Sequence, residues 1–457
     1  MSTRVRNIAL FPLLSLPCLA SLNTPVALNV TDRSGVIRAD EGITTGVPIP
    51  QSANITDVRK LMVTRARGES CASGVTIDSM LHVVARWNGA PNDVKKPIKW
   101  IWVELIGDVT ANGKSTYCLT DRVGSDPGTT AVKVTEDRTF ITVATGAMTF
   151  RVRRDYFNFL DTVQVHEATL VSSSRDNKWA VTAGGVEYNT AARDGTYSAI
   201  VEYPAVNQDD NSSGEPIRAQ IKLSGRFTST SGKQALHYQF RLSAYAKGTS
   251  ILMYPTITFS EDCFAFKPTN IALSLSAQLK DSLTYAFGTS SGTKTASYLP
   301  TDDFVLVQHD HGNGDDGYTI NKNGAALESG TQAPGWIDIN DGSSGITAWV
   351  RDFWQNYPMA LEANGKVLKI HMWPDYDFTR QFDAKRDQAL RGSPGFGVIW
   401  PSAEGRAMDF TPLAPNSNRI ITTVSNANPA VIGVRGFNVM DTGGNGFCTG
   451  SVVTSGC

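Results

Sequence analysis

Short segments in which apolar and polar residues alternate recur along this 457-residue chain to about residue 375, with turn sequences between them. One of them places Leu236, Tyr238, Phe240 and Leu242 on a single face, which is the period of two that a β-strand requires. Forty Gly, 21 Pro and only 19% charged residues suit a chain with many turns. The sequence predicts an all-β protein dominated by a large antiparallel β-sandwich.

The segment from Ile98 to Leu105 gives the clearest strand prediction in the first part of the chain. It places Trp100 and Trp102 on one face and aliphatic residues on the other. Because both faces are apolar, we expect a central strand that is covered on both sides. Trp100 and Trp102 are therefore expected to belong to the core.

Two hairpins and one loop follow from turn signals. Val26 to Val30, the turn Asp32-Arg33-Ser34-Gly35 and the returning segment predict one hairpin. Residues 139–154 predict another, folding at Thr145-Gly146. The polar run at 207–214 predicts a surface loop within the sandwich.

The first 24 residues predict a secretory signal peptide or an N-terminal arm. Arg4 and Arg6 precede an apolar run from Ile8 to Leu19, which is followed by small residues typical of a cleavage site. Pro12 and Pro17 within the run leave an uncleaved arm as the alternative. No window is long and apolar enough for a membrane span, and a formal net charge of -1 argues against a nucleic-acid partner.

Six cysteines allow disulfides but give no zinc-binding spacing. A Cys71–Cys118 bridge would link two segments of the first domain, and Cys448 with Cys457 would close a small terminal loop. We predict no resident cofactor. The oxygen-rich loop from Gln308 to Gly317 suits calcium in outline, but it matches no known calcium-loop spacing and a solvated turn is favoured.

Aromatic, cationic and imidazole side chains crowd together near residues 350–374. Val350 to Pro358 predicts a short helical turn that ends at the proline, and Leu368 to Pro374 predicts a strand. Arg351 and His371 are the candidate catalytic residues, and both are candidate sugar ligands together with Trp354 and Trp373. The alternative is a buried aromatic corner closed by an Arg351 ion pair.

Two further groups are weighed for sugar binding. Trp87 is a third tryptophan that could stack on a sugar ring, with core packing as its alternative. Arg151, Arg153, Arg154 and Tyr156 lie at a strand end and could neutralise a uronate. Because Arg151 and Arg153 alternate outward on a strand, a solvated face is favoured over a uronate clamp.

Several motifs occur in the order found in one known family. Gly46-Val47-Pro48-Ile49-Pro50, Arg86-Trp87-Asn88-Gly89 and the strand that starts at Ile98 resemble the GVPxP and RWxDGSIKW motifs of exo-rhamnogalacturonan lyase family proteins. Residues 350–374 resemble the end of that family's central sandwich. The resemblance implies a small RIFT-like β-barrel at 25–128 and a central β-sandwich at 129–375. The Gly-, Pro- and Asn-rich sequence at 376–457 predicts an irregular segment. The family's C-terminal α/α toroid finds no counterpart in this sequence.

The resemblance implies a carbohydrate context more strongly than lyase activity. We expect a non-catalytic carbohydrate-binding or structural protein, secreted or surface-displayed, that faces acidic, uronate-containing polysaccharide. One alternative is an exo-acting polysaccharide lyase that cleaves rhamnogalacturonan by β-elimination. The other is a phage virion or filament protein that assembles with further copies of itself, which the prolines in the N-terminal run motivate.

Overall fold

The computed structural model describes residues 20–22, 24–32, 37–123, 131–203, 212–214, 216–261, 265–308, 317–351, 353–375, 428–434 and 438–441. Regular structure in these ranges is β-strand apart from three one-turn 3-10 helices, which confirms the all-β fold class. Within the same ranges, no helix has the length and hydropathy needed to cross a membrane. Residues 309–316 of the predicted calcium loop, residues 1–19 and 23 of the predicted signal or arm, and most of the C-terminal segment lie outside the described residues.

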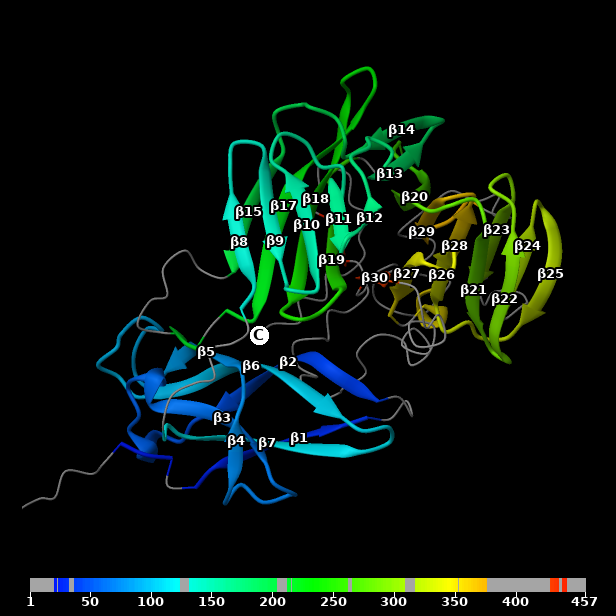
Figure 1. The fold of residues 1–457 in the computed structure, drawn as a ribbon. Coiled ribbons are helices and arrows are strands. Elements are labelled where there is room, and N and C mark those ends of the chain that lie inside the picture. The colour runs from blue at the N-terminus through cyan, green and yellow to red at the C-terminus, as the bar shows by residue number, and fades with distance from the viewer. Residues whose placement is uncertain are drawn as a thin grey trace, which may run out of the picture.

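Two four-stranded sheets form the first part of the molecule (Figure 1). Their strand orders are β1-β7-β3-β4 and β16-β5-β6-β2. The two sheets enclose a core of aliphatic side chains that includes Val47, Ile101 and Leu119. The elements are β1 (Val26–Thr31), β2 (Arg38–Pro48), η1 (Gln51–Ala53), η2 (Val58–Lys60), β3 (Leu61–Ala66), β4 (Gly74–Thr76), β5 (Ser79–Arg86), β6 (Ile98–Val109), β7 (Lys114–Asp121) and β16 (Ser212–Ser213).

The predicted hairpin between the first two strands is wrong. β1 pairs with β7, with Val26 opposite Leu119, whereas β2 pairs with β6 and places Gly46 opposite Trp102. The two strands therefore lie in different sheets. The turn signal between them is real in sequence, but the long pairing of β2 with the apolar strand β6 decides where β2 lies.

The strand predicted from Ile98 is confirmed as β6, but its tryptophans are not in the core. Trp100 is 40% exposed and Trp102 is half-buried, whereas Ile101, Val103 and Leu105 are fully buried. The aliphatic face alone fills the space between the two sheets. The tryptophan face points away from that core, so the core prediction for Trp100 and Trp102 is wrong.

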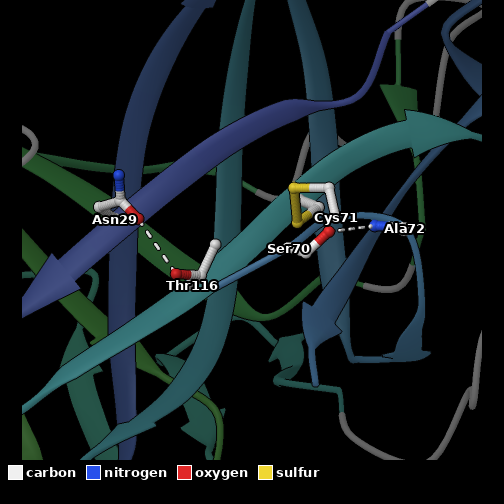
Figure 2. The surroundings of a disulfide bond; sticks show 6 residues. Asn29, Ser70, Cys71, Ala72 and Thr116 are labelled. Carbon is white, nitrogen blue, oxygen red and sulfur yellow. Dashed lines mark hydrogen bonds between the residues drawn. A yellow bond between two sulfur atoms is a disulfide. The ribbon is translucent and has the colours of Figure 1, made fainter. Parts of the chain in front are cut away.

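The predicted disulfide between Cys71 and Cys118 is confirmed (Figure 2). It joins the loop between β3 and β4 to the middle of β7 across 47 residues of sequence. Nearby, the Thr116 hydroxyl donates to the Asn29 side-chain oxygen and connects β7 to β1. A cross-link over this separation stabilises a small domain mainly by restricting the unfolded chain. The other four cysteines lie outside the described residues.

A five-stranded sheet with the order β12-β11-β10-β9-β8 opens the second part and faces strands β15, β17, β18 and β19 (Figure 1). The predicted hairpin at 139–154 is confirmed as β9 and β10. Phe150 from one sheet and Phe240 from the other are fully buried in the same core. The strands are β8 (Lys133–Glu136), β9 (Phe140–Ala144), β10 (Met148–Arg153), β11 (Thr162–Val165), β12 (Ala168–Val171), β13 (Lys178–Ala183), β14 (Val186–Asn189), β15 (Ser198–Tyr203), β17 (Arg218–Ser229), β18 (Gln234–Tyr245) and β19 (Ser250–Phe259).

The remaining strands form a separate group of paired strands around aromatic side chains. β20, β29, β28 and β23 pair in succession on one side, and β21, β26 and β27 pair on the other. Tyr285 and Phe304 meet between them with ring centroids 4.0 Å apart. The elements are β20 (Pro268–Ser276), β21 (Leu283–Thr289), β22 (Gly292–Tyr298), β23 (Asp303–Gln308), β24 (Tyr318–Lys322), β25 (Ala325–Gly330), β26 (Trp336–Asn340), β27 (Ser344–Val350), η3 (Trp354–Asn356), β28 (Met359–Asn364), β29 (Val367–Trp373), β30 (Asn428–Val434) and β31 (Asn438–Asp441).

Polar contacts join the first part to the sandwich. Arg218 of β17 pairs with the buried Glu104 of β6 at 2.6 Å. The Tyr245 ring lies against Gly42, where a β-carbon would overlap it. β16, which falls within the predicted loop at 207–214, pairs with β5 instead of staying a free surface loop. The two parts are thus connected by several contacts and not by a linker alone.

Candidate functional site

Four arginines gather around two aromatic rings where the central strands β9 and β10 of the five-stranded sheet begin and end. β10 turns Met148, Phe150 and Val152 toward the core, so Arg151 and Arg153 project from the opposite face. Phe140 lies directly across from Arg153 in the strand pairing. We call the arginine cluster the set Arg151, Arg153, Arg175 and Arg193 with the rings of Phe140 and Tyr156.

Three guanidinium groups surround the Tyr156 ring. The guanidinium carbon lies 4.7 Å from the ring centroid for Arg153 and 5.1 Å for both Arg175 and Arg193. Arg175 comes from the turn between β12 and β13, and Arg193 follows β14. Each contact is a favourable cation–π interaction. Tyr156 thus gathers cations from three separate segments.

Phe140 supports the other side of the cluster. Arg151 lies 4.4 Å and Arg153 lies 5.2 Å from its ring centroid. The Arg151 side chain also donates through Nε to the Thr162 hydroxyl on β11 at 2.9 Å. These contacts fix both strand arginines in place.

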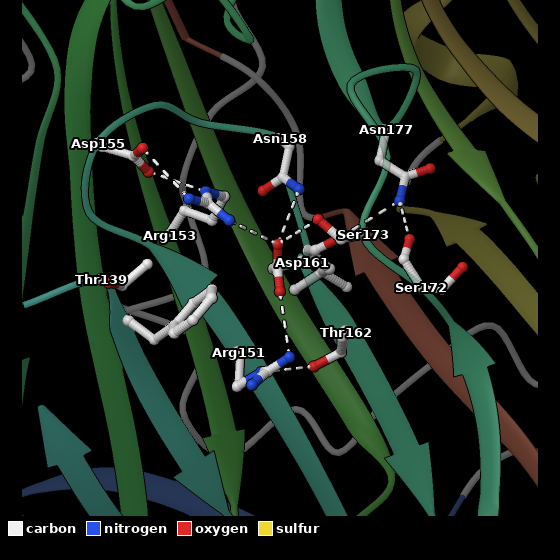
Figure 3. Close-up of polar contacts among 12 residues, drawn as sticks. Thr139, Arg151, Arg153, Asp155, Asn158, Asp161, Thr162, Ser172, Ser173 and Asn177 are labelled. Carbon is white, nitrogen blue, oxygen red and sulfur yellow. Dashed lines mark hydrogen bonds and ion pairs between the residues drawn. The ribbon is translucent and has the colours of Figure 1, made fainter. Parts of the chain in front are cut away.

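Asp161 is the buried carboxylate between the two strand arginines (Figure 3). It is 1% exposed and lies 3.4 Å from Arg151 and 3.5 Å from Arg153. The Ser173 hydroxyl donates to it at 2.6 Å, and the Asn158 amide donates at 3.4 Å. A buried carboxylate with this many donors holds the arginines at one position.

Asp155 carries the second negative charge. It accepts from Arg153 at 2.8 Å and 3.2 Å and pairs with Arg193 at 2.8 Å. Burial alone would raise the pKa of Asp155, but the Arg153 hydrogen bonds and the charges of Arg153 and Arg193 outweigh it and lower the pKa. The carboxylate therefore stays ionised between the two arginines.

Arg175 is the one arginine of the cluster that pairs with neither Asp155 nor Asp161. Within the described ranges it forms no ion pair, although it lies on the Tyr156 ring. Four guanidinium groups thus face Asp155 and Asp161, and Arg151 also interacts with the charge of Asp137, so four positive and three negative charges leave an excess of one. Cations held this close together repel one another unless an anion joins them. The cluster has the chemistry of an anion-binding site.

The interpretation of these arginines as a solvated face is wrong for Arg153. Its side chain is only 16% exposed and its partners are two carboxylates and two aromatic rings. The hydrogen bonds from Arg153 to Asp155 raise its pKa further, so it remains charged. Strand alternation correctly predicted the direction of the side chain, but not the loops that fold over it.

The cluster lies inside a recognisable domain. Residues 132–286 match the model of the PcRGLX-like protein central beta sandwich domain, which is rhamnogalacturonan lyase-like. No curated protein matches the chain. All four arginines and both aromatic rings of the cluster fall within the matched residues.

The predicted corner at residues 350–374 lies beyond the PcRGLX-like match. As expected, a helical turn (η3) precedes Pro358 and a strand (β29) carries His371. His371 is 2% exposed, and its ring nitrogens contact Glu362 at 2.8 Å and Asn270 at 3.0 Å. These two partners come from the neighbouring strands β28 and β20.

Glu362 was missed in the sequence although it is the main partner of His371. It is 2% exposed and lies 2.5 Å from Lys369 on β29. Burial alone would raise its pKa, but hydrogen bonds and charge from His371 and Lys369 outweigh this and lower the pKa to about 2. Only the pairing of β28 with β29 reveals this contact, because it places Glu362 opposite Lys369.

The tryptophans predicted to bind sugar differ in exposure. Trp373 is 2% exposed and packs in the core, as the buried-corner alternative expects. Trp354, on η3, and Arg351 are both half-buried. Trp87 is half-buried in the first part of the molecule, where its Nε1 donates to the Ile49 carbonyl at 3.0 Å.

The described part of the chain offers no metal site beside the arginine cluster. There, no group of three or more His, Cys, Asp or Glu side chains is arranged to hold a metal ion. A cavity of about 370 Å³ lies beside Asp40 and Lys247 at the junction of the two parts. Those two side chains already pair at 3.1 Å, so their charges are matched.

Proposed function

We propose that the protein binds anionic, uronate-containing polysaccharide at the arginine cluster and does not cleave it. The observation that carries the proposal is Arg175, a cation over the Tyr156 ring that pairs with no carboxylate in the described ranges. Guanidinium groups bind carboxylates with two parallel hydrogen bonds. A uronate carboxylate would supply the negative charge that the cluster lacks.

The cluster supplies only part of what elimination requires. Cleavage needs a cation for the carboxylate, a base for the α-proton and an acid for the leaving oxygen. Arginine stays protonated and does not act as a base. Asp155 is held by two arginines, and Tyr156 is 6% exposed beneath three of them. This favours binding over catalysis.

The binding test compares Arg175→Ala with the unchanged protein. We expect affinity for an oligogalacturonide to fall about 10-fold to 100-fold, since a hydrogen bond to a charged group contributes about 1.5–3 kcal/mol. Isothermal titration calorimetry measures the change, with a neutral galactan oligosaccharide as the comparison ligand. The loss should be restricted to the acidic ligand.

Arg241→Ala is the matched control for this experiment. Arg241 lies on β18 of the same domain and pairs with Glu202 at 2.7 Å, away from Tyr156. It should bind the oligogalacturonide with unchanged affinity. Equal losses for Arg175→Ala and Arg241→Ala would mean a nonspecific charge effect and would refute the proposal.

An exo-acting rhamnogalacturonan lyase is the second candidate. The observation behind it is the Glu362–His371 pair, because a carboxylate that orients a histidine is a common general-base arrangement, but this histidine is 2% exposed and would have to be uncovered to reach a substrate. An unsaturated uronate product that absorbs in the ultraviolet after incubation with rhamnogalacturonan, and that disappears in His371→Gln, would establish this activity. We expect no such product.

A secreted or surface-displayed location fits the proposed ligand. The Cys71–Cys118 disulfide supports it, because such bonds persist in oxidising compartments. Mass spectrometry of the natively produced protein would detect this bond and the start of the mature chain.

A further inference from the structure

A second group of aromatic and cationic side chains lies on the first part of the molecule, away from the arginine cluster. It consists of Trp87, Lys99 and Trp100 with Lys96 and Pro48, and we call it the tryptophan–lysine patch. None of these residues belongs to the matched domain. Strand β6, the end of β2 and the turn after β5 bring them together.

Trp100 is held flat against the neighbouring strand. A β-carbon placed on Gly46 would lie 2.5 Å from the indole Nε1, so the ring rests on the glycine backbone. Gly46 does not have the positive φ for which glycine is usually required. Its role is therefore to leave space for the ring. The indole remains 40% exposed on its other side, beside the exposed Pro48 opposite it in register.

Trp87 is fixed next to this surface. Its Nε1 donates to the Ile49 carbonyl at 3.0 Å, and the Ile49 amide donates to the Lys99 carbonyl at 2.9 Å. The Lys99 ammonium lies 4.9 Å from the Trp87 ring centroid. The Trp87 indole is thus positioned by a backbone hydrogen bond, and the Lys99 ammonium lies over its ring.

Positive charge is in excess around the patch. Lys95, Lys96 and Lys99 are all exposed, and in the described part of the chain none of them forms an ion pair. Asp93 is the acidic side chain in the same turn, and it caps the backbone amide of Lys95 at 3.2 Å. The surface beside the indoles therefore complements an anion.

We propose that the tryptophan–lysine patch is a second glycan-binding site, at which a uronate ring stacks on Trp100 and its carboxylate meets Lys99. Sugar rings present a flat C–H face that packs on an indole, and the lysines select for an acidic sugar over a neutral one. The choice of ligand rests on the proposed function. The site itself rests on the Gly46-backed indole and the unmatched lysines.

The test titrates an oligogalacturonide into the full chain and into single variants. Trp100→Ala should lower the affinity about 3-fold to 10-fold, which corresponds to loss of one aromatic stacking contact. Trp100→Phe should restore part of it. Lys99→Ala should weaken binding of the acidic ligand and leave the weak binding of a neutral galactan oligosaccharide unchanged. Because Trp100 is partly exposed, these variants should retain the wild-type melting temperature.

The two proposals fail separately in this experiment. If Arg175→Ala weakens binding and Trp100→Ala does not, the second site is refuted and the proposed function stands. If only Trp100→Ala weakens binding, the patch stands and the arginine cluster is refuted as the binding site. Unchanged affinity in both variants, or no binding by the wild-type chain, would refute both. A Gly46→Ala variant that keeps wild-type affinity while shifting the ring would also contradict stacking on Trp100.

Discussion

Glu362→Ala is expected to lower the free energy of unfolding by about 3–5 kcal/mol, the range typical of breaking a buried ion pair from one side. Glu362 is 2% exposed and accepts from His371 at 2.8 Å and from Lys369 at 2.5 Å. Alanine leaves a buried imidazole and a partly buried ammonium without their carboxylate. It also opens a cavity between β28 and β29.

Chemical denaturation measures this loss, and Glu187→Ala is the matched control. Glu187 pairs with Lys178 at 2.7 Å, but it is 47% exposed. Exposed pairs contribute less than about 1 kcal/mol. If Glu362→Ala lowered the free energy of unfolding as little as Glu187→Ala does, the Glu362–His371 pair would have no structural role.

The same carboxylate predicts how stability changes in acid. The folded-state pKa of Glu362 is lowered to about 2 from its usual 4.5. Its contribution is therefore present above about pH 4.5 and is lost as the pH falls toward 2. Glu362→Ala should show a shallower fall in stability than the wild type over this range.

How far the sequence predicts the fold depends on whether the signal is local. The hairpin at 139–154 is predicted correctly because its turn and both strands are adjacent in sequence. The pairing of β1 with β7 is not predicted, because β7 lies far from β1 in the sequence of the first part. Alternation also shows that residues 98–105 have two apolar faces, but not which face is inside; only packing against β2 and β5 places Trp100 outside.

The candidate site shows the same limit. The sequence singles out Arg151, Arg153 and Tyr156 because they are neighbours on one strand end. Arg175 and Arg193 come from later turns, and nothing in their own segments links them to Tyr156. His371 is found by its aromatic surroundings, whereas its partner Glu362 emerges only from the register between β28 and β29. Residues that act through cross-strand or loop contacts require the folded structure.

Asp338 on β26 should make the folded protein less stable as the pH rises, whereas Glu362 makes it less stable as the pH falls. It is 2% exposed and accepts from the Thr347 hydroxyl at 2.7 Å and from the Asn340 amide at 2.6 Å. Burial raises its pKa to about 6, because these two hydrogen bonds only partly compensate for lost hydration. The ionised form is therefore disfavoured in the folded protein.

The pKa of Asp338 is higher in the folded protein than its unfolded value of 3.8, so its protonated form contributes to the free energy of unfolding. This contribution is fully present below about pH 4 and is lost as the pH rises through 6. A shift of about two units corresponds to about 3 kcal/mol, which is the upper limit of the cost at neutral pH.

Asp338→Asn should remove most of this cost. We expect the variant to be more stable than the wild type by about 1–3 kcal/mol at pH 7 and equally stable at pH 4, because asparagine keeps the shape without the charge. Denaturant unfolding at intervals between pH 4 and pH 8 measures the difference. Asp341→Asn is the control: burial would raise the pKa of Asp341, but backbone amides and the Ser343 hydroxyl lower it to about 2, so losing its charge should destabilise. If Asp338→Asn and the wild type gave parallel stability curves across this range, Asp338 would not be the buried acid that sets the slope.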